Sequence, residues 1–130
     1  MVTDRVGDFI IRLQNAGAIG NTTVVAPHSN HIEDIANKLK ELGFVERVEV
    51  SKTAPRTLEV TLSYDAAGKH KIRGVKRISK PGRRLYVSAR DAHSVKNGMG
   101  AALISTPKGV LADKEARKVR QGGEALFEIW

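Results

Sequence analysis

The chain of 130 residues contains no cysteine. This absence excludes a disulfide framework, a thiolate nucleophile and a zinc site with cysteine ligands, and it is compatible with a reducing cytosol. No apolar run approaches the roughly 20 residues that a membrane-spanning helix needs, and no signal peptide opens the chain. Internal repeats and low-complexity segments are also absent. These absences predict a compact cytoplasmic protein that does not bind a membrane.

Motifs of the common enzyme classes are missing as well. The chain has no Walker phosphate-binding loop and no paired-carboxylate context. A triad of Ser105, His93 and either Asp91 or Asp113 can be written down, but no nucleophile elbow surrounds the serine. We therefore predict that the protein is not an enzyme, with no catalytic residue and no cofactor.

Two histidines raise the question of a metal site. His28 and His31 are three residues apart and lie near Glu33 and Asp34. Structural zinc needs four ligands, and no further ligand pair with a fixed spacing follows. The preferred interpretation is a polar loop that caps a helix, and no metal is predicted.

Positive charge is plentiful and is confined to one half of the chain. The formal net charge is +8. Residues 1–65 hold 7 Lys and Arg against 9 Asp and Glu, whereas residues 66–130 hold 15 against 5. Such a one-sided excess causes self-repulsion unless an anion neutralises it. Nucleic acid is the usual anionic partner of a basic domain, so the second half is the predicted nucleic-acid-binding half.

Hydrophobic periodicity predicts an α-β-α-β-β domain over residues 1–65. Two segments carry apolar residues at the spacing of a core-facing helix. The first helix is expected to begin after an N-cap at Thr3 and to end at Gly17. The second is expected to begin at Asn30, with Glu33 completing a capping-box-like pattern, and to end at Gly43. Strands are expected at Thr22 to Ala26, Val45 to Ser51 and Arg56 to Tyr64, the last with Leu58, Val60 and Leu62 facing inward.

Residues 66–130 predict a mainly antiparallel β domain with short helical turns. Pro81 and Gly82 signal a type II turn. One helical turn is expected over Asp91 to Lys96, and another capped by Asp113 and running through Arg117. The expected strands are Lys71 to Ile78, Arg84 to Ser88, Ala101 to Ser105, Gly109 to Leu111 and Glu124 to Ile129. The predicted fold class is α+β, with domains 1–65 and 66–130 packed on each other.

The most informative segment runs from Gly100 to Lys118. An apolar run delivers two adjacent hydroxyls, Ser105 and Thr106, into a tight turn that ends at Gly109, and basic residues surround the turn. Small hydroxyls can donate to and accept from 2′-OH groups in the shallow minor groove of RNA. The alternative is that both residues are ordinary turn formers that bond their own backbone.

Four other features point the same way, each with a structural alternative. Gly122 and Gly123 let a backbone approach a ligand closely, or form a flexible turn. Glu124 can accept from a base amino group or order the Ser105–Thr106 turn. Tyr86 can stack on a sugar or base, or cover the core. Eight cations within residues 69–84 exceed what protects a sheet edge, so phosphate contact is the better interpretation.

The segment from Gly100 resembles the family of the eighth protein of the small ribosomal subunit, a universal family of ribosomal RNA binders. The resemblance extends to residues 77–82 and, more loosely, to the first helix, so it covers essentially the whole chain. The residues that fit the family signature in register are Gly100, Leu103, Ile104, Ser105, Thr106, Gly109, Val110, Leu111, Ala116 and Arg117.

The resemblance implies a structural protein of the cytoplasmic ribosome. It implies that the protein binds a stem in the central domain of small-subunit ribosomal RNA, helps subunit assembly and contacts neighbouring ribosomal proteins. Some members also repress their own messenger RNA. The expected RNA-binding residues are Ser105, Thr106, Pro107, Lys108, Gly109, Gly122, Gly123, Glu124, Tyr86, Arg77, Lys80, Arg83, Arg84, Arg117, Arg12, Asn15 and Ser29.

Two other functions stay open at this point. One is a regulatory protein whose main target is messenger RNA, which competition between the two RNAs would distinguish. The other is a surface for anionic membranes, which would need an amphipathic helix with a basic face. The predicted helices are neutral or acidic, and the cations lie on predicted strands, so the membrane alternative is disfavoured.

Overall fold

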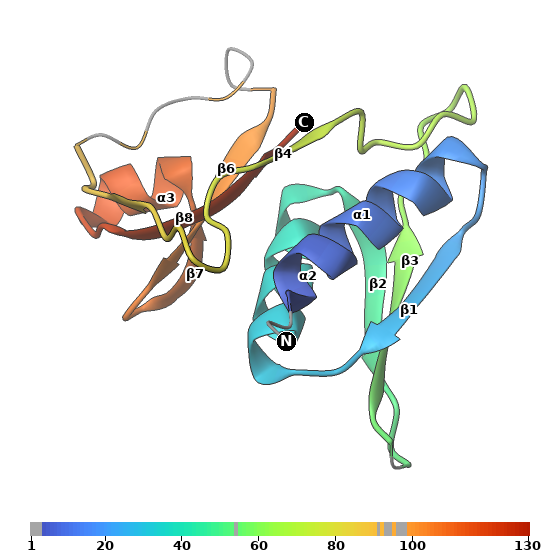
Figure 1. Cartoon of the computed structure of the whole chain (residues 1–130). Helices are drawn as coiled ribbons and strands as arrows, with labels where there is room; N and C mark the ends of the chain where they lie inside the picture. Colours follow the sequence, from blue (N-terminus) through green and yellow to red (C-terminus); the bar gives the residue numbers. More distant parts are fainter. Residues whose placement is uncertain (1–3, 54, 91, 93–94, 96–98) are drawn as a thin grey trace. The chain divides into compact units, whose positions relative to one another are not determined.

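The structure is a computed structural model that describes residues 4–53, 55–90, 92, 95 and 99–130 (Figure 1). Its helices and antiparallel strands confirm the predicted α+β class. The chain divides into two compact units. We call residues 8–73 the amino-terminal unit, and residues 74–130 together with residues 1–7 the carboxy-terminal unit. The predicted domains, 1–65 and 66–130, stay a prediction.

The amino-terminal unit is a three-stranded antiparallel sheet with two helices (Figure 1). Its elements follow the predicted order, and the sheet order is β1-β3-β2. The central strand alternates as predicted, with Leu58, Val60 and Leu62 buried and Glu59 exposed. The buried stripes of both helices complete this core. The elements are α1 (Arg5–Ala18), β1 (Thr23–Pro27), α2 (Asn30–Leu42), β2 (Val45–Val50) and β3 (Thr57–Leu62).

The helix α2 begins at Asn30, as predicted, but the residue that caps it is the one before. The N-cap is Ser29, whose Oγ accepts a hydrogen bond of 3.2 Å from the N–H of Ile32, so the predicted capping-box-like pattern of Asn30 and Glu33 is wrong. Ser29 has the extended backbone that an N-cap needs, whereas Asn30 is already helical. The predicted stop at Gly43 is confirmed by its left-handed φ of 89°. The predicted cap at Thr3 lies outside the described residues.

The predicted end of α1 at Gly17 is wrong, because the helix continues to Ala18. The left-handed residue after the helix is Gly20, with φ of 81°. Gly17 is small for a different reason. A Cβ at Gly17 would lie 2.4 Å from Nδ1 of His70, so only glycine lets this ring pack against the helix.

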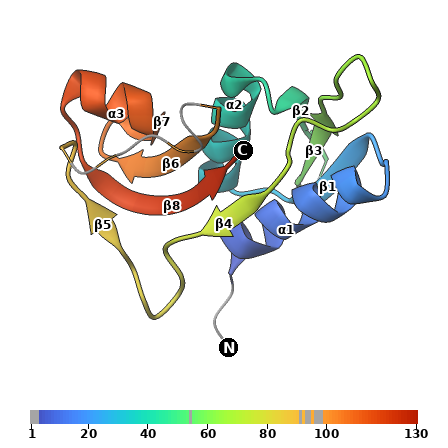
Figure 2. The ribbon, with the colours of Figure 1, turned by 90° about the horizontal axis from the view of Figure 1, so that it is seen from above.

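The carboxy-terminal unit is built around one long strand. Figure 2 shows β8 as a curved strand, with β6 along one edge and β4 and β5 along the other. Beyond β6 lies β7, and α3 packs on this hairpin over a core of Ile104, Ala92 and Ala116. The elements are β4 (Val75–Arg77), β5 (Tyr86–Val87), β6 (Ala101–Thr106), β7 (Gly109–Ala112), α3 (Asp113–Val119) and β8 (Gly123–Ile129).

Two predicted strands of this unit are shorter in the structure. The segment from Lys71 to Ile78 contributes only the three residues of β4, because β8 ends opposite Val75 at Ile129. The segment from Arg84 to Ser88 contributes only β5. Of the helical turn predicted over residues 91–96, only residues 92 and 95 are described.

The start of α3 also corrects the prediction. Its N-cap is Ala112, and Asp113 is the first helical residue. The buried carboxylate of Asp113 instead accepts from the N–H of Ala102 on β6 at 3.1 Å and from Arg117 at 2.9 Å. Asp113 therefore joins α3 to the sheet rather than capping the helix.

Candidate nucleic-acid interface

Three of the predicted site residues form one row across the carboxy-terminal sheet. The strand register pairs Tyr86 of β5 with Glu124 of β8, and Glu124 with Ser105 of β6. Residues directly opposite each other in antiparallel strands project from the same face. An aromatic ring, a carboxylate and a hydroxyl therefore lie side by side. Tyr86 is 71% exposed, which favours stacking on a ligand over covering the core.

The two adjacent hydroxyls have different tasks in the structure. The Oγ1 of Thr106 donates to the carbonyl of Gly109 at 2.7 Å and accepts from the N–H of Lys108 at 3.1 Å, so it orders the β6–β7 turn. The hydroxyl of half-buried Ser105 has no hydrogen bond to any residue that the structure describes. Thr106 thus behaves as a turn former, while Ser105 keeps a hydroxyl for a ligand.

The tip of this hairpin is a two-residue loop. Pro107 and Lys108 are both exposed, between the paired residues Thr106 and Gly109. Proline at the first loop position has its φ preset for a tight turn. Gly109 has φ of 109°, which a residue with a Cβ rarely adopts. The loop therefore presents Lys108 from a rigid support.

Gly122 and Gly123 allow strands of the protein itself to approach closely. A Cβ on Gly123 would lie 2.1 Å from the carbonyl oxygen of Ser105, and one on Gly122 would lie 2.5 Å from that of Val87. Both distances are far shorter than van der Waals contact. These glycines hold β8 tightly between β5 and β6, and so they set the spacing of the row.

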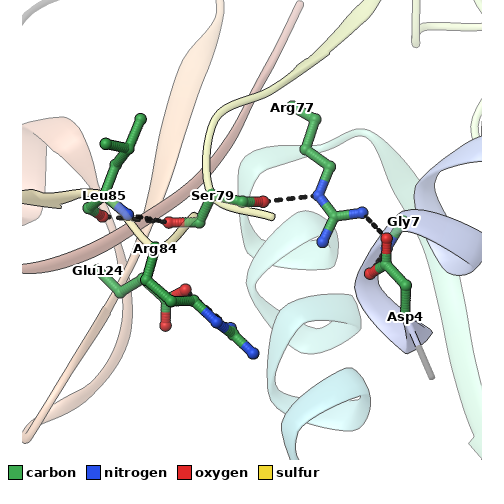
Figure 3. Close-up of polar contacts among 7 residues, drawn as sticks. All are labelled: Asp4, Gly7, Arg77, Ser79, Arg84, Leu85 and Glu124. Atoms are coloured by element: carbon green, nitrogen blue, oxygen red, sulfur yellow. Dashed lines mark hydrogen bonds and ion pairs between the residues drawn. The ribbon is translucent and has the colours of Figure 1, made fainter. Parts of the chain in front are cut away.

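The central carboxylate of the row is held by an arginine. Nη1 of Arg84 donates to Oε2 of Glu124 at 2.9 Å (Figure 3). The hydrogen bond to Glu124 raises the pKa of Arg84 above its usual range. The side chain of Glu124 is 17% exposed, so it can still accept from a ligand. Because Arg84 offsets its charge, Glu124 repels a neighbouring phosphate less than a free carboxylate would.

The predicted RNA ligand Arg77 is engaged inside the carboxy-terminal unit. Its Nη1 pairs with the carboxylate of Asp4, and its Nε donates to the carbonyl of Ser79 at 2.6 Å (Figure 3). The hydrogen bond from Arg77 lowers the pKa of Asp4 below its usual range. Half-buried Arg77 therefore has less of its guanidinium available to an external phosphate.

Arg117 and Arg12 are engaged in the same way. Nη1 of Arg117 donates to Asp113 and to the carbonyl of Ala92, each at 2.9 Å. Arg12 donates to Asp8 and to the carbonyl of Val25, each at 2.9 Å. Internal pairing thus distinguishes these arginines from the exposed lysines of the surface.

The remaining predicted residues are spread over two places. In the carboxy-terminal unit, exposed Lys80 and Arg83 close the turn at Pro81 and Gly82 through backbone hydrogen bonds of 3.1 and 2.9 Å. The φ of 84° at Gly82 confirms the predicted turn. In the amino-terminal unit, Asn15 is exposed on α1, whereas Ser29 caps α2.

Sequence reasoning missed the role of Ser79. This buried serine donates from Oγ to the carbonyl of Leu85 at 3.1 Å and accepts from its N–H at 2.9 Å (Figure 3). It therefore fixes the residue before Tyr86 and the entry into β5. The available signal was its position inside the stretch Arg77 to Gly82 that carries the resemblance.

Other kinds of site find little support in the described part of the chain. No group of three His, Cys, Asp or Glu side chains among those residues could hold a metal ion. His28 is hydrogen-bonded through Nε2 to Oε1 of Glu33 at 2.8 Å. No helix within the described ranges is long and apolar enough to cross a membrane.

Comparison with known proteins adds an independent finding. The family model for Ribosomal protein S8 matches residues 4–130. The small ribosomal subunit protein uS8 of Deinococcus deserti is 41% identical over 133 residues, which cover 100% of both chains. The uS8 protein of Mycoplasmopsis synoviae is 44% identical over 99% of this chain and 98% of its own length. That of Lactobacillus delbrueckii subsp. bulgaricus is 40% identical over 100% and 99%, respectively.

Proposed function

Because the chain belongs to the ribosomal protein S8 family, we propose that its carboxy-terminal sheet is the surface that reads RNA. The chain is a structural constituent of the small subunit of the cytoplasmic ribosome. Membership in this family implies contact with small-subunit ribosomal RNA and with neighbouring ribosomal proteins. The family is not an enzyme class. That the chain lacks any catalytic activity stays a prediction.

The proposed RNA target is a stem in the central domain of small-subunit ribosomal RNA, and binding there helps subunit assembly. The observation that carries this proposal is the row formed by Tyr86, Glu124 and Ser105 beside the β6–β7 loop. It combines an exposed ring, an acceptor and a hydroxyl, the three chemistries that recognise sugars and unstacked bases. A tight row of this kind suits the shallow minor groove, where 2′-hydroxyls and base edges are displayed.

Phosphate contacts are proposed for the exposed cations next to this row, chiefly Lys108 at the loop tip. Phosphate contacts position a protein, while contacts to base edges and sugars give specificity. Gly122 and Gly123 act indirectly, by setting the strand spacing. Lys80 and Arg83 line a hollow elsewhere on the sheet, and a different partner is proposed for them below.

Repression of the chain's own messenger RNA is a further proposal. It requires that this RNA present the same shape as the ribosomal stem to the row. If so, the two RNAs compete for one site, and each displaces the other from the purified protein. Simultaneous binding of both RNAs would contradict this proposal.

The test of the main proposal is binding of the purified protein to the central-domain stem and to an unrelated duplex across a salt series. A double variant, Ser105→Ala with Thr106→Ala, removes both hydroxyls. We expect the parent to prefer the stem and the variant to lose this preference while keeping its salt slope. Thr106→Ser keeps the hydroxyl that orders the turn, and serves as the matched control. Equal binding of both RNAs by the parent would reject the proposed specificity.

A further inference from the structure

A hollow of about 500 Å³ lies in the carboxy-terminal unit between the loop that connects β4 to β5 and strand β8. Tyr86, Glu124 and Ser105 are not among the described residues that line it. Three cationic side chains, one internally paired arginine and one carboxylate form its walls, and aliphatic side chains form its floor. The lining residues are Lys76, Arg77, Ile78, Lys80, Arg83, Leu85, Val87, Ala125 and Glu128.

The strand register places Lys76, Val87 and Glu128 of this hollow on the face of the sheet opposite to the row. Tyr86 belongs to the row, and its neighbours Leu85 and Val87, which line the hollow, project to the other side. A register shift opposite Leu103 and Ile104 marks a bulge in β8. The bulge adds one residue, so Glu128 projects to the opposite side from Glu124 despite an even spacing. One sheet therefore offers two distinct surfaces.

The cations of the hollow lack partners inside the described part of the protein. Lys76, Lys80 and Arg83 are exposed, and their side chains form no hydrogen bond or ion pair with a residue that the structure describes. They differ in this respect from Arg77, Arg84 and Arg117, each of which is paired. The three cations outnumber the one carboxylate that lines the cavity, Glu128, so the cavity keeps an excess of positive charge that is complementary to an anionic partner.

The floor of the hollow decides which kind of anion fits. It is aliphatic, with Leu85 38% exposed and Ile78 and Val87 half-buried. Recognition of single-stranded RNA usually relies on aromatic platforms for stacking, and the described lining residues include no aromatic ring. An apolar pocket with a charged rim instead resembles the anatomy of a protein interface, with a desolvated centre and a polar edge.

We propose that this hollow docks an acidic segment of a neighbouring protein in the small subunit, with one apolar side chain of the segment on Leu85 and its carboxylates on Lys76, Lys80 and Arg83. The proposal rests on the proposed function for the presence of neighbouring proteins. It assigns the two faces of one sheet to two partners, RNA on the row and protein on the hollow.

Site-specific cross-linking in assembled small subunits tests the proposal. The chain has no native cysteine, so Leu85→Cys provides a unique thiol for a benzophenone reagent inside the hollow. Lys108→Cys places the same probe at the loop tip near the row. We expect the Leu85→Cys probe to label a protein segment rich in Asp and Glu, and the Lys108→Cys probe to label ribosomal RNA.

A second change makes the test specific for charge. Adding Arg83→Glu to Leu85→Cys should abolish most of the cross-linked protein, whereas Lys52→Glu, which changes an exposed cation of the amino-terminal unit, should not. If Leu85→Cys does not enter subunits, Lys76→Cys supplies a probe on the rim.

Three results would overturn the proposal: labelling of RNA alone from the hollow, labelling of nothing, or a protein label that Arg83→Glu leaves intact. If instead the Lys108→Cys probe fails to label RNA while the hollow labels an acidic segment, the proposed RNA surface fails and this inference stands.

Discussion

The two faces of the carboxy-terminal sheet carry positive charge in different ways. On the face of the row, Arg84 is paired with Glu124, and an exposed aromatic ring and a hydroxyl lie beside that pair. On the face of the hollow, three cations without a partner among the described residues surround an aliphatic floor. Net charge alone predicts a polyanion for both surfaces. The pairing of each cation and the chemistry next to it separate a surface suited to RNA from one suited to an acidic protein segment.

The largest effect is expected from a substitution that changes the spacing of the strands that carry both faces. Gly123→Ala would place a Cβ 2.1 Å from the carbonyl oxygen of Ser105. Because backbone must move to relieve the clash, we expect a loss of about 1–3 kcal/mol in the free energy of unfolding together with loss of RNA binding. Urea denaturation and RNA titration measure the two effects.

The control for that substitution is Gly68→Ala. Gly68 has a positive φ of 83°, and no atom lies within 4 Å of the position that its Cβ would take. Its backbone strain should reduce stability by about 1–2 kcal/mol without changing RNA affinity. If Gly123→Ala leaves RNA binding at the parental level, the spacing of the row is unimportant for recognition.

Removing the exposed ring of Tyr86 should affect RNA binding by the row and leave the hollow unchanged. Tyr86→Ala is expected to weaken binding to the stem by about 1–3 kcal/mol, the usual contribution of one stacked base. Because Tyr86 is 71% exposed, the free energy of unfolding should change by less than about 0.5 kcal/mol. The neighbouring Leu85 lines the hollow, so the affinity of Leu85→Ala for the stem should equal that of the parent. If Tyr86→Ala and Leu85→Ala lose equal affinity for the stem, the two faces do not differ in RNA binding.

Removing the partner of Arg84 should give the row an unpaired cation, as the hollow has. Glu124→Gln abolishes the ion pair, and the released guanidinium becomes available to a phosphate. The salt slope of RNA binding should then steepen by about one, the change expected for one added phosphate contact. The preference for the stem over an unrelated duplex should fall, because the amide of glutamine has an NH2 donor in place of one of the two acceptor oxygens of the carboxylate. An unchanged slope would indicate that Arg84 has no access to phosphate.

The smallest expected effect concerns the pair between Asp4 and Arg77. The hydrogen bond from Arg77 lowers the pKa of Asp4 in the folded state below its ordinary value of 3.8. The pair therefore stabilises the folded protein above pH 3.8. This stabilisation is lost as the pH falls through the lower folded-state pKa. The Asp4 side chain is 37% exposed, so the contribution should be below about 1 kcal/mol. The free energies of unfolding in urea of Asp4→Asn and the parent should differ at pH 6, and the difference should shrink as pH falls below 3.8. A constant difference would contradict the linkage.

Local patterns predicted much of the fold. Alternation along residues 58–62, the glycine stop at Gly43 and the Pro81–Gly82 turn are short-range signals, and the structure confirms them. Long-range pairing was not predictable in the same way. Asp4 and Arg77 are separated by 73 positions, and nothing in the local sequence of either indicates the other.

The candidate site was predictable in its residue types but not in its arrangement. Ser105, Tyr86 and Glu124 were identified separately, and only the strand register joins them in a row. The bulge in β8 reverses the face of every residue beyond it, so sequence spacing could not separate Glu124 from Glu128. RNA contact by Lys80 and Arg83 stays a prediction, and the docking that we propose at the hollow is the alternative to it.

One set of salt titrations tests the two-face account most directly. The binding constant for the central-domain stem is measured over a series of salt concentrations for the parent, Lys108→Gln and Arg83→Gln. The quantity compared is the slope of its logarithm against the logarithm of salt concentration. The account predicts a slope shallower by about one for Lys108→Gln and an unchanged slope for Arg83→Gln. An unchanged slope for Lys108→Gln together with a shallower one for Arg83→Gln would show that the hollow, and not the row, faces the RNA.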